Sequence, residues 1–574
     1  MKSRIPSITI TYDDMSKCEH IDRFKKITTA TQNPLLQTIC MAVDCTVGKS
    51  GEYLTSILTA SEVSKLPDGK SIMVCSPTGS GKTRAMRYIA FAEKEKVPVV
   101  ILTNREGCWT QIAKDILAQD GINDFPPELI DRISFPKNIS VMTYQKFAGI
   151  CSCYENKPVL LILDECHCFA EDAVFSSYSQ KILRFLHRNL DVTRRIYMTA
   201  TPDAVLSAIW KLECRSDAKL YPFNSNNPDL ALLGVPDSTE TRINHVYLMQ
   251  PNWDYITFQT YNPRDKETLI QYLNKQKEQH RKAIVFINNK EAGAALSSEF
   301  ENSQHIYSDA AKQEDIRVIA INERFESDFL ITTTVAENGL SIHDNQLSVI
   351  VAETDDMIAL QQIIGRARVD RKASSVITVL IPDYSASDLG CSVGRLVTQL
   401  RAFQEAEKNP GMLLQNNENN QPYVYYDAFL GKPVLNELGK HELERRIDEL
   451  NMLRESIEDH AFVRKVLSVY QKSTDNIEEL SIDYDRISVL KLRIRSLWET
   501  FDRSMHDEEA LKDLKSNLRS LCTKSAGYPK EIKGNIQIET VNAILAFAGI
   551  PKEICKDSYR VFDSRDSPSS TNTH

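Results

Sequence analysis

The sequence lacks the features of secreted, membrane and fibrous proteins. No apolar segment of about 7–15 residues follows the first residues, so no secretory signal is expected. No run of about 18 apolar residues could form a membrane-spanning helix. Glycine and proline number 20 and 22 among 574 residues, which excludes collagen-like and proline-rich classes. These absences predict a cytoplasmic protein that is not secreted and has no membrane partner.

The cysteines do not form a recognisable disulfide or zinc pattern. There are 13 of them, an odd number scattered over a long chain, which favours reduced thiols. Two C-x-C pairs, Cys151/Cys153 and Cys166/Cys168, have shorter gaps than structural zinc sites usually show. Free thiols are therefore expected, and no metal cluster is predicted.

The charge balance is acidic, with 69 Lys and Arg against 78 Asp and Glu and a formal charge of −9. This excludes a general polycation but allows a local basic channel. The composition, 42% hydrophobic and 26% charged, is that of a globular protein. At roughly 150 residues per domain, the length predicts about three to four domains.

From about residue 70 to 385, short β-branched apolar runs alternate with helical stretches, which is typical of parallel α/β sheets. Runs this continuous indicate strands covered on both faces. A first set of strands is predicted at 71–75, 99–102, 139–143, 159–163 and 195–199, and a second set at 282–287, 329–333, 347–351 and 376–381. The segment 217–242 contains several Pro, Asn and Asp residues and is predicted to be a linker between the two sets.

After residue 383 the pattern becomes helical. Helices are predicted at 383–403, 443–457, 487–501, 508–522 and 539–548, separated by polar loops. The complete division predicted from the sequence is a leader at 1–45, a first α/β domain at 46–235, a second at 236–385, a helical accessory domain at 386–562 and a disordered tail at 563–574.

A phosphate-binding loop follows the first predicted strand. The segment 76–83 reads SPTGSGKT and lies between a strand and a helix, which is the P-loop arrangement, although Ser76 stands where Gly or Ala is usual. Backbone N–H groups of such a loop wrap phosphate oxygens, and Lys82 supplies a positive charge to the β- and γ-phosphates. The residues expected to bind ATP are Thr78, Gly79, Ser80, Gly81, Lys82 and Thr83, with the Thr83 hydroxyl as a ligand of Mg²⁺.

A pair of carboxylates follows the predicted strand 159–163. Asp164 and Glu165 at the end of an apolar strand form the Walker B pattern. Asp164 is expected to hold Mg²⁺ through water, and Glu165 to orient or deprotonate the attacking water.

Five motifs in order resemble those of superfamily 2 helicases and translocases. Besides the P-loop, they are the DECH sequence at 164–167, MTATP at 198–202, ITTTVAENGLSI at 331–342 and QQIIGRAR at 361–368. The resemblance covers roughly 71–371, and DECH together with GRAR is similar to Dicer-type and phage recombination helicases. It implies an α/β fold class of two tandem RecA-like P-loop domains with parallel sheets, followed by a mainly helical C-terminal domain.

The resemblance also implies how the second domain acts on ATP. Arg366 and Arg368 would be arginine fingers toward the γ-phosphate, with Arg371 as a third candidate. Gln362 would help to position the water, and Gly339 of the ITTTVAENGLSI motif would contact the nucleotide. No glutamine in a Q-motif setting is identified, so the preference for adenine is left open.

A single nucleic acid strand is expected across both domains, contacted mainly at phosphate and sugar. His167, Thr199 and Thr201 would couple the nucleotide state to this strand. The residues implied to contact it, all at predicted strand ends, are Asn104, Arg105, Thr143, Tyr144, Asn288, Thr332 and Thr333. Trp109 and Trp253 are interpreted as core residues rather than base-stacking ones.

These features predict an ATP hydrolase that acts as a helicase or translocase, with ATP and Mg²⁺ as cofactors. DNA is favoured over RNA as the partner, and a nucleoid-associated location is an alternative to a dispersed cytoplasmic one. Two alternatives stay open: an RNA helicase, and a nucleic-acid-gated ATPase sensor that does not separate strands. The C-terminal helices could brace the α/β domains, recognise a duplex or bind a partner protein.

Overall fold

The computed structural model describes most of the chain and divides it into two compact units. The first unit contains Met1–Thr260 and Gln279–Glu478, and the second contains Tyr261–Glu278 and Glu479–His574. The residues described are 18–122, 135–214, 241–307, 313–333, 342–367, 376–408, 422–427, 430–456, 458–474, 477–480, 486–502, 508–522, 528, 532, 536–550, 552–554 and 561–563. Among them, no helix combines the length and apolarity needed to cross a membrane.

The first unit contains a seven-stranded sheet in the order β1-β7-β2-β6-β5-β3-β4, in which all pairings are parallel. Its strands are β1 (Asp44–Gly48), β2 (Ser71–Cys75), β3 (Val99–Thr103), β4 (Ile139–Thr143), β5 (Val159–Leu163), β6 (Thr193–Thr199) and β7 (Ile243–Met249). We call this sheet and its helices the first lobe. Because the strands are parallel, the segments that follow β2, β5 and β6 meet at one edge of the sheet.

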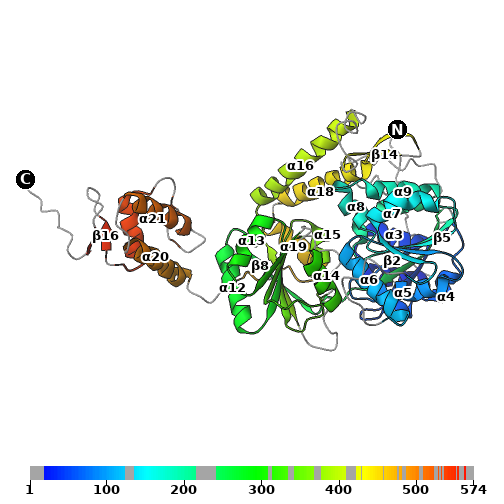
Figure 1. Cartoon of the computed structure of the whole chain (residues 1–574), viewed down its shortest axis with the longest axis horizontal. Helices are drawn as coiled ribbons and strands as arrows, with labels where there is room; N and C mark the ends of the chain where they lie inside the picture. Colours follow the sequence, from blue (N-terminus) through cyan, green and yellow to red (C-terminus); the bar gives the residue numbers. More distant parts are fainter. Residues whose placement is uncertain are drawn as a thin grey trace, which may run out of the picture. The chain divides into compact units, whose positions relative to one another are not determined.

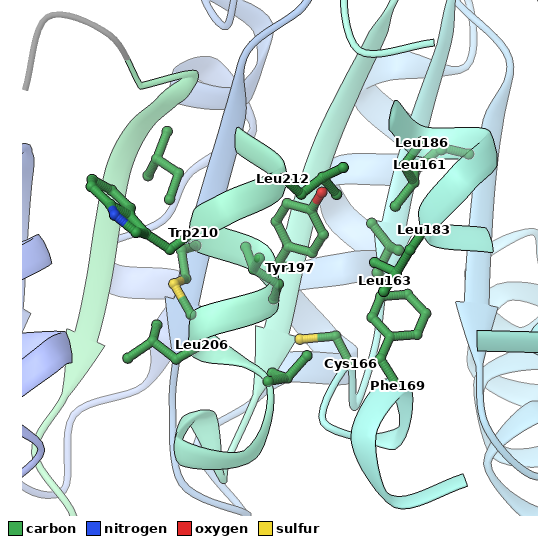
Figure 2. Packing of buried hydrophobic residues seen from close by; sticks show 14 of the residues in the cluster. Leu161, Leu163, Cys166, Phe169, Leu183, Leu186, Tyr197, Leu206, Trp210 and Leu212 are labelled. Atoms are coloured by element: carbon green, nitrogen blue, oxygen red, sulfur yellow. The ribbon is translucent and has the colours of Figure 1, made fainter. Parts of the chain in front are cut away.

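Alternate residues of the first sheet enter two different cores, as a two-residue period requires. In β5, Leu161 and Leu163 join one apolar cluster, while Leu160 and Ile162 join the other. Every residue of β2, β3, β5 and β6 is buried, which confirms strands covered on both faces. Figure 2 shows one of these faces, where β5 and β6 pack against side chains of the helices Tyr178–Arg188 and Leu206–Glu213.

A second sheet has six strands in the order β10-β11-β9-β12-β13-β8. Its strands are β8 (Ile256–Tyr261), β9 (Lys282–Ile287), β10 (Ser303–Ile306), β11 (Phe329–Thr332), β12 (Leu347–Glu353) and β13 (Ile377–Pro382). The pairings from β10 to β13 are parallel. We call this sheet, with the helices of the first unit that follow its strands, the second lobe. The two lobes confirm the expected α/β class with parallel sheets (Figure 1).

Helices follow most of the strands in both lobes. Those of the first lobe are α2 (Cys18–Ala30), α3 (Pro34–Ala42), α4 (Ala60–Ser64), α5 (Lys82–Glu93), α6 (Glu106–Gln119), α7 (Tyr144–Ile150), α8 (Cys168–Glu171), α9 (Tyr178–Arg188) and α10 (Leu206–Glu213). Those of the second lobe are α13 (Lys290–Ser298), α14 (Gln313–Asn322) and α15 (Met357–Ile364).

The first sheet extends beyond both boundaries of the predicted first domain. The strand β1 begins at Asp44, and α2 and α3 in the predicted leader contribute Ile27, Leu36 and Ile39 to the first core. The strand β7 pairs with β1 and β2 although it lies beyond the predicted boundary at residue 235. Neighbours within a sheet are set by tertiary pairing, so the local sequence pattern did not reveal these strands.

The predicted helical domain at 386–562 is divided between the two units. In the first unit lie α16 (Ala386–Lys408), α18 (Glu437–Glu455), α19 (Ala461–Val469) and the hairpin of β14 (Val424–Asp427) and β15 (Lys432–Leu435). In the second unit lie α12 (Lys266–Glu278), α20 (Arg486–Asp502), α21 (Glu508–Leu521), α22 (Ile538–Phe547), β16 (Lys552–Ile554) and β17 (Val561–Asp563). The second unit has its own apolar core, formed mainly by α20, α21 and α22. The predicted tail at 563–574 lies almost wholly outside the described residues.

Candidate nucleotide site

The phosphate loop has the backbone that its glycines permit. Gly79 and Gly81 have φ angles of +75° and +89°, in the left-handed region that a side chain disfavours. Gly81 is the N-cap of α5, so the first N–H groups of that helix open toward the loop. Lys82 is buried, and its Nζ donates to the backbone oxygen of Ser76 at 3.0 Å. The small side chain of Ser76 also donates a hydrogen bond to the Ser80 hydroxyl, so the unusual first residue fits the loop.

The end of β5 places two acidic side chains beside this loop. Glu165 Oε1 lies 3.6 Å from Lys82 Nζ. Burial and the charge of Glu165 raise the pKa of Asp164 to about 7, and the positive charges of Lys82 and Arg366 oppose this rise. The buried Oδ1 of Asp164 has no hydrogen-bond partner among the described residues. An acidic oxygen of this kind fits a role as an outer ligand of Mg²⁺, and Thr83, the other predicted ligand, is the second residue of α5.

Glu165 has a backbone conformation that is unusual for a residue with a side chain. Its φ is +47°, in the left-handed region, and its side chain is buried. A residue held in this region costs about 1–3 kcal/mol, and such strain is concentrated at functional sites. The turn brings the Cys166 N–H to the Met198 oxygen of β6 at 2.9 Å and so aims Glu165 at the phosphate loop.

A chain of polar contacts leads from Glu165 across the end of β6. His167 Nδ1 lies 3.4 Å from Glu165 Oε2 and 3.2 Å from the Thr199 hydroxyl oxygen. The Thr199 hydroxyl also accepts the backbone N–H of Thr201 at 3.0 Å. Burial lowers the pKa of His167 to about 4, so its ring is neutral at pH 7 and acts as a hydrogen-bonding group. The three predicted coupling residues therefore lie next to one another.

The second lobe reaches this site through the end of α15. Gln362 Nε2 donates to the Thr201 hydroxyl at 3.3 Å, and both side chains are buried. Arg366 donates from Nη2 to Gln362 Oε1 at 2.8 Å and from Nε to the Gln362 backbone oxygen at 3.0 Å. A Cβ on Gly365 would lie 2.5 Å from Thr78 Cγ2, so the two lobes touch at this glycine. Gln362 thus holds Arg366 beside the phosphate loop. The predicted Gly339, Arg368 and Arg371 lie outside the described residues.

Two segments match family models that cover these motifs. Residues 58–209 match the model described as DEAD/DEAH box helicase, and residues 265–369 match the helicase conserved C-terminal domain. The first segment carries the P-loop, the DECH sequence and Thr199, and the second carries Gln362 and Arg366. The chain therefore contains two domains of the superfamily 2 helicase type.

Solved structures with similar folds include several superfamily 2 proteins. The DEAD-box helicase Mss116 bound to ssRNA and UDP-BeF is 13% identical over 95% of this chain and 92% of its own, with a TM-score of 0.43. S. cerevisiae Dbp5 bound to RNA and ADP BeF3 is 19% identical over 55% and 80%, with a TM-score of 0.39. The Pyrococcus furiosus Hef helicase domain is 16% identical over 56% and 94%, with a TM-score of 0.30. Since all three TM-scores lie below 0.5, the superfamily 2 assignment rests on the two domain matches.

In these superfamily 2 domains, the predicted nucleic acid residues fall into two groups. Tyr144 is fully buried and donates from its hydroxyl to the Asp164 backbone oxygen at 2.8 Å. Thr332 is also fully buried and donates to the Thr333 oxygen at 3.2 Å. Neither side chain is exposed in this structure, and their contact with a nucleic acid strand stays a prediction. Tyr144 supports the Walker B turn, a role that the sequence pattern did not indicate.

The other predicted contacts range from exposed to buried. Asn288 is exposed at the end of β9. Thr143 caps α7, and Arg105 Nη2 pairs with Asp172 Oδ1 at 2.6 Å. Asn104 is buried, and its amide has no hydrogen-bond partner among the described residues. Thr333 is nearly buried, at 9% exposure.

The sequence also led to predictions for two tryptophans, as core residues, and for the C-x-C cysteines, as free thiols. Trp109 donates to the Val141 oxygen at 2.9 Å, and Trp253 packs against Tyr470. These contacts support the interpretation of both rings as packing residues. Cys166 and Cys168 are buried within the first apolar core, as expected for free thiols.

Proposed function

We propose that this superfamily 2 protein is a nucleic-acid-stimulated ATPase that moves along or unwinds nucleic acid, with the DECH sequence placing it in the DExH subgroup. The observation that carries the proposal is the composite site, in which Gly365 touches Thr78 and Gln362 bonds to Thr201 across the two lobes. A site assembled from two lobes can transmit hydrolysis as a change in the contact between them.

The side chains of the first lobe have distinct proposed roles. Lys82, at the start of α5, would neutralise charge on the β- and γ-phosphates. Glu165 would accept a proton from the attacking water, since its carboxylate is held at the phosphate loop by a strained turn. Thr83 and Asp164 would hold Mg²⁺, which when bound would neutralise phosphate charge.

Arg366 is the proposed arginine finger. Its guanidinium would stabilise negative charge that develops on the transferred phosphoryl group. Two hydrogen bonds to Gln362 limit its freedom, so little conformational entropy would be lost as it engages the transition state. Arg368 and Gly339 remain predictions for this site.

Coupling to nucleic acid would run through His167, Thr199 and Thr201. Their hydrogen bonds join Glu165 in the first lobe to Gln362 in the second. Loss of the γ-phosphate would remove the negative charge that Lys82 and Arg366 share, which would weaken the contact between the lobes. The track of Asn104, Arg105, Thr143 and Asn288 remains the proposed path of the strand.

DNA is the proposed substrate, on the similarity of DECH and GRAR to Dicer-type and phage recombination helicases, and RNA is the alternative. The test measures ATP turnover with matched single-stranded DNA, duplex DNA and single-stranded RNA, together with strand displacement on partial duplexes. The proposal expects the largest rise in kcat with single-stranded DNA and displacement of the paired strand. A larger rise in kcat with RNA would indicate that the protein is an RNA helicase. ATP turnover without strand displacement would indicate a translocase or a sensor. No stimulation by any of the three would contradict the proposed function.

A further inference from the structure

One helix outside the two α/β lobes contacts both of them near the nucleotide site. The helix α18, here called the bridging helix, runs beside α16 and meets α8 of the first lobe (Figure 1). Leu438 near its beginning belongs to the apolar core of the first lobe. Leu453 near its end packs against the core of the second lobe. The bridging helix therefore has one apolar anchor in each lobe.

The beginning of the bridging helix is bound to the segment that follows the DECH sequence. Asn436, its N-cap, is fully buried and donates from Nδ2 to the backbone oxygens of Ala173 at 2.7 Å and Ser176 at 3.3 Å. A Cβ on Gly439 would lie 2.3 Å from the Ala173 oxygen, so the helix backbone approaches this segment very closely. Ala173 lies only nine residues after Asp164, as the sequence numbering shows.

The middle of the same helix is bound to the segment that precedes Arg366. Arg446 Nη2 lies 3.3 Å from Asp356 Oδ2 and 3.6 Å from Asp355 Oδ1. Asp356 is the N-cap of α15, since its Oδ1 accepts the N–H groups of Ile358 at 2.9 Å and Ala359 at 3.3 Å. Gln362 lies in the last turn of α15, and Arg366 directly follows Gly365, the C-cap of that helix. Arg446 therefore holds the carboxylate that begins the helix of the arginine finger.

This ion pair is partly shielded from solvent. Burial would raise the pKa of Asp356, but the charges of Arg446 and Arg445 and the two backbone N–H groups hold it below its usual value. A carboxylate in such surroundings stays charged at pH 7 and needs its positive partner. Arg445 is engaged mainly by Glu442 and Glu449 of its own helix, which leaves Arg446 as the direct partner of Asp356.

We propose that Arg446, acting through Asp356, is a positioning residue for Arg366, and that the bridging helix keeps the DECH segment and the arginine finger aligned. The inference rests on the proposed role of Arg366 in ATP hydrolysis. Misplacement of a catalytic group by about 1 Å can lower a rate roughly 100-fold, so a distant ion pair can matter to turnover without contacting ATP.

The first test replaces Arg446 in the full-length protein and measures stimulated ATP turnover. Arg446→Ala is expected to lower kcat roughly 10- to 100-fold, with the Kd for a fluorescent ATP analogue changed by less than about threefold. Arg446→Lys keeps the charge and should recover part of kcat. The matched control is Arg454→Ala on the same helix, because Arg454 pairs with its neighbour Glu455 and should leave kcat unchanged.

The second test separates positioning of Arg366 from a general loss of stability. If Arg446 acts through Arg366, then adding Arg446→Ala to Arg366→Ala should lower kcat little further, since residues that act as one unit are not additive. A purely structural role would multiply the two losses and would overturn the inference. Gly439→Ala would displace the beginning of the bridging helix from Ala173 and should lower kcat in the same way. This variant tests the inference if Arg446→Ala does not fold.

The outcomes also distinguish this inference from the proposed function. If Arg366→Ala leaves kcat unchanged, the role of the arginine finger fails, and the positioning role fails with it. If Arg366→Ala lowers kcat but Arg446→Ala and Gly439→Ala behave like the Arg454→Ala control, the finger stands and the positioning role alone is overturned.

Discussion

At the scale of single residues, the site is defined by charges that are buried only because they face one another. Lys82, Asp164, Glu165 and Arg366 are all less than one-tenth exposed, which would be very unfavourable for isolated charges. Lys82 offsets Glu165 at 3.6 Å, and Arg366 adds a second positive charge from the other lobe. The arrangement suits a substrate with several negative oxygens and a metal ion.

Glu165→Gln tests whether this carboxylate accepts the proton from water. The amide has the same shape but cannot take a proton, so kcat is expected to fall on the order of 100-fold or more. The Kd for ATP should change little, because removing the charge leaves the phosphate loop intact. Steady-state turnover and equilibrium binding of an ATP analogue measure the two quantities.

The control for this substitution is Glu155→Gln. The Glu155 carboxylate pairs with Arg188 at 2.8 Å, and Glu155 precedes β5, whereas Glu165 follows it. Glu155→Gln should leave kcat unchanged. Weak ATP binding by Glu165→Gln, with turnover per bound ATP preserved, would contradict the role of Glu165 as a base.

Chemistry restricts the residue types of the phosphate loop and the DECH turn more strongly than those of the predicted strand contacts. Phosphate and metal chemistry restrict which side chains can stand at Lys82, Thr83 and Asp164, so their types and spacing identify them. A threonine or tyrosine at a strand end carries no such restriction. Whether Tyr144 and Thr332 face solvent or the core depends on distant segments that pack over them, and that information is absent from the local pattern.

At the scale of elements, the helix α15 contributes to the candidate nucleotide site together with the phosphate loop that it faces. Its first turn is capped by Asp356, its last turn presents Gln362, and Gly365 lets the chain pass close to Thr78. The Gly365 backbone has φ of −67°, so the glycine is required there by the close approach and not by backbone strain. A side chain at this position would separate the two lobes.

Gly365→Ala tests the importance of that close approach. The added methyl would lie 2.5 Å from Thr78 Cγ2, so the second lobe must shift and Arg366 with it. We expect kcat to fall by about tenfold or more, while the thermal unfolding temperature changes little.

Gly394→Ala in α16 is the control, because a Cβ there meets no atom within 4 Å. It should raise helix stability by about 1 kcal/mol and leave kcat unaltered. Equal turnover in the two variants would refute the contact.

The elements themselves were largely predictable where the apolar runs are continuous. The predicted strands 71–75, 139–143, 159–163 and 282–287 match β2, β4, β5 and β9 at both ends. The strands β1, β7 and β8 were not predicted as members of a sheet. Their burial patterns include exposed or intermediate positions, and their place in a sheet depends on neighbours distant in sequence.

At the scale of the whole molecule, both lobes of the first unit contribute residues to the candidate nucleotide site. The acidic total charge of −9 is compatible with this function, because a strand contacted by amides, hydroxyls and backbone groups does not require a basic surface. The helical pair α16 and α18, predicted as part of a separate domain, contributes to the same unit. The helical periodicity of the sequence predicted the two helices but did not predict their contacts with the α/β lobes.

We propose that one site made from both lobes hydrolyses ATP in response to nucleic acid. The most direct measurement compares steady-state ATP turnover of the wild-type protein and Lys82→Ala, each with and without single-stranded nucleic acid. We expect nucleic acid to raise kcat of the wild type and Lys82→Ala to show no turnover above background in either condition. Stimulated turnover retained by Lys82→Ala would contradict it.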